Sequence, residues 1–365
     1  MDKNSSHKAF DRANGSLARP SLKELAQHLG LSPTTVSRVL NNSASAYRIS
    51  PETQERVRAA AAAMNYEANS LARSLRNKHS KTVGVIVPEI SEGYSTAVLS
   101  GIEEILLLSG FFYFVVSHRH RANLLHEYSS MLLARAVEGI IAVDSMLEHS
   151  LPVPVIAVSG HARCASVINL ELDHTLAARY ALEHLNRLGH KKIAFIKGQS
   201  FSSDTTARWK AICKVAAEIG VEINPRLVVQ LEGTGLGSEP GRAATIRLLE
   251  RGLPFTALFA FNDLTAIGAI TVLREAGIGV PSDVSVIGFD DIHSAATNNP
   301  PLTTVRQPLQ EMGRMAATTL LQMIGTEKSA WPKEPIRILP RFVERQSTAL
   351  ANSQRAAQEL VFSAR

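Results

Sequence analysis

Residues 21–41 read SLKELAQHLGLSPTTVSRVLN, and the first half of this stretch carries the boundary signals of a short helix. Ser21 is a suitable N-cap, and Glu24, three residues later, completes a capping box. Apolar residues recur at helical spacing on one face: Leu22, Leu25, Ala26 and Leu29. Gly30 can then adopt the tight turn that ends the helix. The pattern predicts an amphipathic helix followed by a sharp turn.

The second half of the stretch predicts a second helix with two different faces. Ser32 is its N-cap, and Pro33 stands at the first helical position, where a missing N–H costs nothing. Val36, Val39 and Leu40 form an apolar face. The opposite face carries side chains that suit base edges and phosphates: Ser32, Pro33, Thr34, Thr35, Ser37, Arg38 and Asn41. This pattern is typical of a helix-turn-helix that enters the DNA major groove, although a generic helical hairpin shares it.

Three further segments follow in a regular order. Ser50 and Pro51 begin a third helix, ISPETQERVRAAAAAMNY. Residues 68–80 read ANSLARSLRNKHS, and the strand pattern TVGVIVP comes directly after them. With these segments in place, the stretch closely resembles the DNA-binding head of the lactose-repressor (LacI/GalR) family of bacterial transcription regulators. The resemblance implies that residues 68–80 are the hinge between this head and a ligand-binding body.

The positive charge of the chain is concentrated in its first 80 residues. They contain 12 Lys and Arg against 6 Asp and Glu, whereas residues 81–365 contain 27 of each. Phosphate binding requires such a local positive surface. We predict that the phosphate contacts come from Arg38, Arg48, Arg73, Arg76 and Lys78. The alternative for each of these side chains is that water alone solvates it.

The hinge segment predicts a second kind of groove contact. The resemblance implies that two hinge helices pair in a dimer and push Leu75 into the minor groove, where an apolar wedge kinks the duplex. The alternative is that Leu75 packs on the body. The predicted DNA contacts of the hinge are Asn69, Ala72, Arg73, Leu75 and Arg76. Because so short a helix is marginal in water, we expect it to order on DNA.

Length and composition bound the remaining architecture. A chain of 365 residues with 45% hydrophobic residues predicts two or three folded units. We predict a disordered tail at 1–18, a helix-turn-helix domain at 19–67, the hinge at 68–80, an effector-binding and dimerisation domain at 81–348, and a tail at 349–365. The last of these lacks the leucine heptads of a tetramerising coiled coil, which favours a homodimer.

The location of the protein is predicted from what the sequence lacks. No apolar run reaches the roughly 18 residues of a membrane span, and residues 1–18 have no apolar signal-peptide core. Cys164 and Cys213 have no metal-like spacing and suit a reducing compartment. We therefore expect a cytoplasmic protein that does not contact the membrane.

From residue 81 onward, short apolar runs alternate with helical patterns. The strand candidates are residues 83–87, 112–116, 139–143, 155–158, 192–196, 227–230, 257–261 and 284–289. Continuous hydrophobicity suits parallel strands that are buried on both faces. The pattern predicts a doubly wound α/β unit that occurs twice, with a break near residues 169–173. The resemblance implies a periplasmic-binding-protein-like body whose two subdomains are joined by crossovers near 170, 298 and 331.

Polar residues at strand ends predict a ligand cleft in the second half of the body. Open α/β sheets bind ligands at the carboxyl ends of their strands. Asn262 and Asp290 follow strand candidates, and Arg208 lies early in the helix after another. The resemblance implies that these three side chains contact an effector, and their chemistry suits a sugar or similar polyol. Asn262 or Asp290 could instead cap a helix or turn, and Arg208 could form a surface ion pair.

The first half of the body departs from the family pattern. Many members have Asn-Pro followed by two aromatic residues where this chain has Glu92-Gly93-Tyr94-Ser95. Tyr94 can still offer a ring to a sugar face, and Asp144 stands at a strand end. Phe259 and Phe289 would suit a planar ligand, and Phe261 fills a slot that is usually small. The predicted effector contacts are Tyr94, Asp144, Arg208, Phe259, Asn262 and Asp290.

Catalytic motifs are absent from the sequence. It contains no dinucleotide fingerprint, phosphate-binding loop or nucleophile elbow. His118, His120 and His126 come nearest to a metal cluster, but we interpret them as the solvated start of a helix. We therefore predict no enzyme, metal or cofactor.

The function predicted from the sequence is a homodimeric repressor of carbohydrate-related genes, which binds a near-palindromic operator and is switched by a sugar-like effector. The alternatives are a purine, a phosphorylated metabolite or a partner protein as effector. A solute-binding protein or a carbohydrate enzyme is a more distant alternative.

Overall fold

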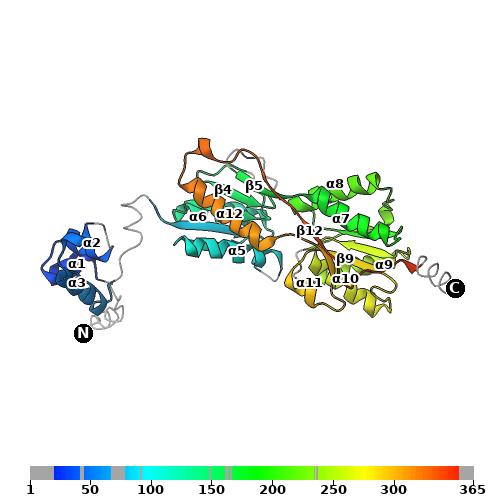
Figure 1. The fold of residues 1–365 in the computed structure, drawn as a ribbon, viewed down its shortest axis with the longest axis horizontal. Coiled ribbons are helices and arrows are strands. Elements are labelled where there is room, and N and C mark those ends of the chain that lie inside the picture. Colours follow the sequence, from blue (N-terminus) through cyan, green and yellow to red (C-terminus); the bar gives the residue numbers. More distant parts are fainter. Residues whose placement is uncertain are drawn as a thin grey trace, which may run out of the picture. The chain divides into compact units, whose positions relative to one another are not determined.

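The computed structural model describes residues 20–41, 45–66, 79–90, 93–147, 149–160, 164, 167–233, 235 and 237–352. The chain divides into two compact units, residues 1–80 and 81–365 (Figure 1). The tail predicted at 1–18 lies outside the described residues, and so do the hinge contacts predicted at Asn69, Ala72, Arg73, Leu75 and Arg76.

The first unit packs three helices around a small apolar core. The elements among its described residues are α1 (Leu22–Leu29), α2 (Pro33–Leu40), the short 3₁₀ helix η1 (Ala46–Arg48) and α3 (Pro51–Ala63). The predicted capping box forms, because Ser21 Oγ accepts from the backbone N–H of Glu24 at 3.2 Å and the Glu24 carboxylate accepts from Ser21 N–H at 2.6 Å. Gly30 ends α1 with a φ of 65°. All three helices contribute fully buried side chains: Leu25, Val36, Val39 and Val57.

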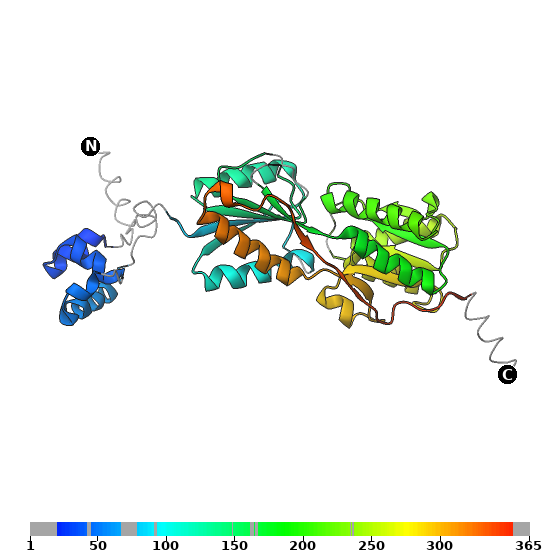
Figure 2. The same ribbon diagram turned by 45° about the horizontal axis from the view of Figure 1, so that its top comes forward.

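The second unit contains two six-stranded sheets, each covered by helices on both faces (Figures 1 and 2). We call the part built on the first sheet subdomain 1. Its strands run in the order β11-β5-β4-β3-β1-β2, and every neighbouring pair is parallel. They are β1 (Thr82–Val87), β2 (Phe112–Ser117), β3 (Gly139–Val143), β4 (Val155–Val158), β5 (Val167–Leu172) and β11 (Ile336–Ile338).

Three helices cover the sheet of subdomain 1. They are α5 (Tyr94–Leu108), α6 (Ala122–Ala134) and α12 (Leu309–Ile324). The backbones of α5 and α12 touch, since a Cβ at Gly101 would lie 1.9 Å from the Gln310 carbonyl oxygen and one at Gly313 would lie 2.1 Å from that of Val98. Glycine at both positions therefore allows a close helix contact, although α12 lies more than 200 residues after α5.

Subdomain 2 is built on the second sheet, with the strand order β12-β10-β9-β8-β6-β7. Its strands are β6 (Ile193–Lys197), β7 (Val228–Gln230), β8 (Ala257–Ala260), β9 (Ser285–Asp290), β10 (Thr303–Arg306) and β12 (Arg341–Val343). Only the edge pair of β10 and β12 is antiparallel among the described pairs. The helices and 3₁₀ turns that follow residue 173 are α7 (His174–Arg187), α8 (Ser203–Glu218), η2 (Pro225–Leu227), α9 (Glu239–Glu250), α10 (Asp263–Glu275), α11 (His293–Thr297) and η3 (Lys328–Ala330).

The chain passes between the subdomains at residues 172–174, 307–308 and 339–340. The family resemblance placed the second and third passages near 298 and 331, which is too early. Three short strands, β10 to β12, were also missed from the sequence, because their sequences TTVR, IRI and RFV mix polar and apolar residues. All eight strands predicted from the sequence form in the structure. Besides β10 to β12, strand β5 was also missed from the sequence. Among the described residues, no helix has both the length and the apolar character needed to cross a membrane.

Candidate functional site

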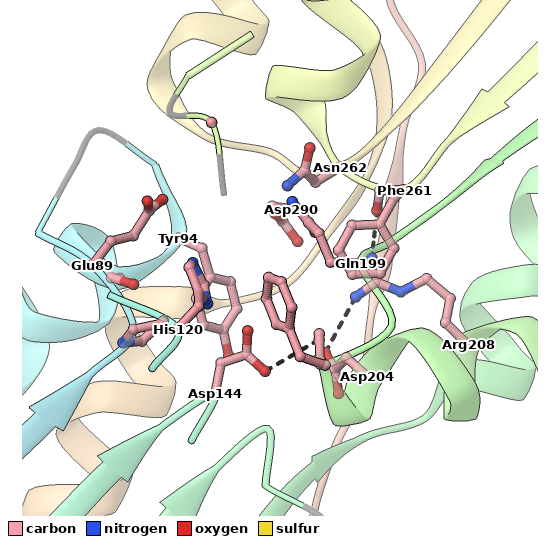
Figure 3. A pocket seen from close by; sticks show the side chains of 15 residues that line it. Glu89, Tyr94, His120, Asp144, Gln199, Asp204, Arg208, Phe261, Asn262 and Asp290 are labelled. Atoms are coloured by element: carbon pink, nitrogen blue, oxygen red, sulfur yellow. Dashed lines mark hydrogen bonds and ion pairs between the residues drawn. The ribbon is translucent and has the colours of Figure 1, made fainter. Parts of the chain in front are cut away.

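A cleft of about 100 Å³ opens where strand ends of the two subdomains face each other (Figure 3). Parallel strands direct their carboxyl ends to one edge of a sheet, so residues distant in sequence gather there. The lining residues are Pro88, Glu89, Tyr94, Ser95, His120, Asp144, Gln199, Phe201, Ser202, Asp204, Arg208, Gly235, Phe261, Asn262 and Asp290.

Backbone strain is concentrated at the same strand ends. Asp144 follows β3 with a φ of 39°, Ser159 follows β4 with a φ of 52°, and Asp290 ends β9 with a φ of 108°. Side chains other than glycine rarely adopt such angles, and each instance costs on the order of 1–3 kcal/mol. Strain of this kind is typical of ligand sites, where it holds polar groups in place.

The wall formed by subdomain 1 presents Tyr94 and Asp144, as predicted from the sequence. Tyr94 begins α5, and its hydroxyl donates to Ser159 Oγ at 2.6 Å. Burial raises the pKa of Tyr94 well above its ordinary value. Burial and the nearby Asp204 likewise raise the pKa of Asp144. Asp144 Oδ1 accepts a hydrogen bond at 3.3 Å from the hydroxyl of Ser202, which belongs to the opposite wall.

The wall formed by subdomain 2 presents Asn262 and Asp290. Asn262 caps α10, because its Oδ1 accepts from the backbone N–H of Thr265 at 2.9 Å. The same side chain also lines the cleft, so the capping alternative and the cleft position are both realised. Asp290 is 5% exposed and accepts from Gln307 Nε2 at 2.6 Å. Burial raises the pKa of Asp290 to about 7, although Arg208 and Gln307 oppose this shift.

Arg208 lines the cleft, and each of its two terminal nitrogens donates one hydrogen bond within the protein, whereas its buried Nε has no hydrogen-bond partner. Its guanidinium donates to the Phe261 carbonyl oxygen and, at 3.3 Å, to Asp204 Oδ2. The guanidinium carbon lies 4.4 Å from the centroid of the Phe261 ring and 3.6 Å from that of Phe289. Arg208 is only 4% exposed. The alternative of a surface ion pair is therefore wrong, because the ion pair of Arg208 with Asp204 is buried.

The structure places two aromatic rings outside the cleft lining. Phe259 is 2% exposed and packs against Phe195, with ring centroids 6.4 Å apart. Phe259 lies two residues before Phe261, so it is farther from the carboxyl end of β8 and its side chain packs in the core. Phe289 is fully buried beneath Arg208. The prediction of Phe259 as an effector contact is therefore wrong for this structure, and the ring of Phe261 lines the cleft instead.

Several lining residues were not identified from the sequence. Asp204 lies one helical turn before Arg208, and this i,i+4 spacing of opposite charges was a usable signal. His120 and Phe201 come from opposite subdomains, and their ring centroids lie 4.4 Å apart, a contact that no local pattern indicates.

His118 is buried, its Nε2 lies 2.9 Å from Ser145 Oγ, and burial lowers its pKa to about 4. The interpretation of this segment as solvated was therefore wrong for His118.

The exposed face of α2 is the candidate nucleic-acid interface of the first unit. Its exposed residues are Ser32, Pro33, Thr34, Arg38 and Asn41, with Thr35 and Ser37 half-buried. Ser32 Oγ caps the helix by accepting from Thr35 N–H at 3.0 Å. The Asn41 amide donates to the Ser37 carbonyl oxygen at 2.7 Å, and this bond orders the end of the face.

Beside this face, η1 presents a residue that was not identified from the sequence. Tyr47 is 74% exposed, and its hydroxyl accepts from Arg48 Nε at 3.1 Å. Gln54 of α3 stabilises this turn, because its Nε2 donates to the carbonyl oxygens of Ala46 and Ile49 at 3.0 Å each. Arg48 is exposed, as expected for a phosphate contact.

Comparison with known proteins agrees with this arrangement. Residues 21–69 match the family model described as bacterial regulatory proteins, lacI family, and residues 182–348 match the periplasmic binding protein-like domain. Over 337 residues the chain is 33% identical to the HTH-type transcriptional repressor PurR of Haemophilus influenzae, across 89% of this chain and 98% of that protein. The chain belongs to the LacI family.

Solved structures support the assignment of this LacI-family chain. The lac repressor dimer bound to operator and the anti-inducer ONPF superposes with a TM-score of 0.79 and 26% identity, covering 90% of this chain and 99% of that one. The complex of the transcriptional regulator CelR with cellobiose gives 0.65 and 28%, covering 90% and 100%. The chain is thus a DNA-binding transcriptional regulator with a helix-turn-helix head and a periplasmic-binding-protein-like body, which confirms the predicted family, fold class and general function.

Proposed function

We propose that this LacI-family regulator is a cytoplasmic, homodimeric repressor whose DNA binding is switched by a small sugar-like ligand in the cleft. The observation that carries the proposal is the convergence of Asp144, Asp290, Asn262 and Tyr94 on one cleft between the subdomains. Carboxylates accept hydroxyl hydrogens, an amide both donates and accepts, and an aromatic ring covers the apolar face of a sugar. The binding of cellobiose in the structure of CelR supports this choice of ligand.

For the DNA side, we propose that α2 enters the major groove. Pro33, Thr34 and Arg38 would meet base edges or phosphates, because they are exposed on one face of a rigidly capped helix. The hinge contacts proposed from the family resemblance, among them the Leu75 wedge, would kink the centre of the site. Two heads related by a twofold axis read a near-palindromic sequence. The lac repressor dimer on its operator supports this arrangement.

Switching requires that the ligand bind two states of the regulator with different affinity. The cleft is already bridged by two hydrogen bonds from the start of α8: Ser202 to Asp144 at 3.3 Å and Ser203 Oγ to the Ser159 carbonyl oxygen at 3.2 Å. A ligand that engages Asp144 competes with Ser202 for the carboxylate. Ligand binding would thereby change how the two subdomains are held together.

A thermal-shift screen of the full chain against sugars, sugar acids, sugar phosphates and nucleobases tests this proposal. A ligand that binds the native state raises its melting temperature by mass action. We expect a shift with a sugar, and a change of at least tenfold in operator affinity when that sugar is added to an operator selected from random duplexes. A panel in which only nucleobases shift the transition would contradict the sugar proposal. Operator affinity that is unchanged at saturating ligand would contradict the switch.

A further inference from the structure

Carboxyl groups outnumber cationic groups in the lining of the cleft. The carboxyl side chains are Glu89, Asp144, Asp204 and Asp290, whereas Arg208 is the single Lys or Arg among the described lining residues. Figure 3 shows these carboxyl groups coming from both walls.

The charge of Arg208 is already balanced within the protein. Asp204 Oδ2 accepts from its guanidinium at 3.3 Å, while Asp204 Oδ1 lies 3.3 Å from His174 Nε2. Phe261 and Phe289 cover the guanidinium, and the Phe261 carbonyl oxygen accepts a second hydrogen bond. Arginine recognises phosphate or carboxylate by a planar fork of free donors. Asp204 balances the charge of the guanidinium and takes one of its terminal N–H groups, and the Phe261 carbonyl oxygen takes another, so only part of this fork is left for an anionic ligand group.

The other polar groups of the cleft supply an excess of acceptors. Neither Asp144 nor Asp290 takes part in any of the ion pairs found between described residues. Asp290 accepts from Gln307, whose Oε1 is itself buried without a hydrogen-bond partner. Buried acceptors are costly unless a donor reaches them. A ligand rich in hydroxyl or amine donors can reach the remaining lone pairs of these carboxyl groups and of Gln307, whereas a phosphate group adds more acceptors.

We propose that Asp204 is a specificity-determining residue, which neutralises Arg208 and thereby restricts the cleft to donor-rich ligands without an anionic group. This inference rests on the proposed function, since it concerns the ligand of the same cleft. It rejects a phosphorylated metabolite as effector. It also assigns to Arg208 a role in shaping the cleft rather than in anion recognition.

Matched ligand pairs test the inference on the unmodified protein. Thermal shifts are measured with glucose, glucosamine and glucose 6-phosphate, with galactose, galactosamine and galactose 6-phosphate, and with ribose and ribose 5-phosphate. We expect the amine or the parent sugar to shift the transition in at least one series, and each phosphate ester to bind at least tenfold more weakly than its parent. A phosphate ester that binds more tightly than its parent would overturn the inference and leave the cleft as an effector site.

Two matched amide variants separate the role of Asp204 from the total charge of the cleft. D204N removes the charge that balances Arg208, whereas E89Q removes one carboxylate from the same lining and leaves that pair intact. We expect D204N alone to gain at least tenfold affinity for a phosphate ester. An equal gain in E89Q, or no gain in a D204N protein whose circular dichroism is native, would overturn the inference.

The variants also keep the inference separate from the proposed function. If no parent sugar shifts the unmodified protein, the sugar proposal is wrong, while a phosphate ester that stabilises only D204N still upholds the role of Asp204. Asp204→Ser replaces D204N if the amide variant does not fold.

Discussion

The head and the cleft differ in how far their parts are separated along the chain. The recognition face of the head comes from residues 32–41, and its capping bonds join residues three or four positions apart. The cleft draws on residues from Pro88 to Asp290, and its bonds join Asp144 to Ser202 and Arg208 to Phe261. The comparison teaches that local capping rules suffice for the first site, while the second depends on which strand ends the fold brings together.

Leu25→Ala gives the largest expected effect and separates the two regions. Leu25 is fully buried in a core shared by three short helices, and truncating a buried leucine costs about 2–5 kcal/mol. A unit of this size has little stability to spare, so we expect operator binding to be lost. Gel-shift and thermal-shift measurements check this, with Gln27→Ala on the exposed face of α1 as control. A parallel loss of ligand binding would contradict the independence of the two regions.

The pH dependence of the body tests the buried carboxyl of the cleft. Burial raises the pKa of Asp290 from 3.8 to about 7, so the folded state binds this proton more tightly than the unfolded state. The stabilisation is fully present below pH 3.8 and is lost as the pH rises towards 7, by an amount on the order of a few kcal/mol. Denaturation of the ligand-free protein at several pH values measures it. D290N should flatten this part of the profile; an unchanged slope would exclude Asp290 as its source.

Leu75→Ala tests the predicted contact between the hinge segment and the minor groove of the operator. Loss of an apolar wedge removes the contact that offsets the unstacking of a base step. We expect operator affinity to fall about tenfold, with ligand binding in the cleft unchanged. Fluorescence anisotropy with an operator selected from random duplexes measures the first quantity, and thermal shift measures the second. Unchanged operator affinity would reject the wedge.

Ser50→Ala gives the smallest effect and tests the local rules of the head. Ser50 caps α3 by accepting from Thr53 N–H at 3.3 Å, and losing such a cap costs about 1 kcal/mol. We expect a lower melting temperature of the head and a modest loss of operator affinity. Glu55→Ala, on the exposed side of the same helix, is the control. Equal effects of the two substitutions would mean that the cap does not carry the stability.

The sequence predicted the helices of the head and eight strands of the body from local signals. Capping residues act within one helical turn, and a continuous apolar run indicates a strand that is buried on both faces. Strands β10 to β12 lack such a run and are held by pairing with distant partners, such as Ile336 with Leu170. Local pattern could not identify them.

In the candidate site, the sequence predicted which residues line the cleft better than it predicted what surrounds each side chain. Tyr94, Asp144, Asn262 and Asp290 all line the cleft, because polar residues near the carboxyl ends of parallel strands gather at one edge of each sheet, and these two edges face the cleft. Phe259 was assigned to the cleft because the depth of a residue along its strand cannot be read from the order of residues alone. Its burial depends on Phe195 of a neighbouring strand.

The sequence by itself determined the helix-turn-helix head, the repeated α/β pattern and the polar strand ends, because these depend on contacts between near neighbours. Only the tertiary structure decided that Asp204 and two aromatic rings hold Arg208, that Ser202 reaches Asp144 across the cleft, and that Phe259 lies in the core. These features depend on which distant segments meet. Burial and pairing in three dimensions then set the charge that each side chain presents to a ligand.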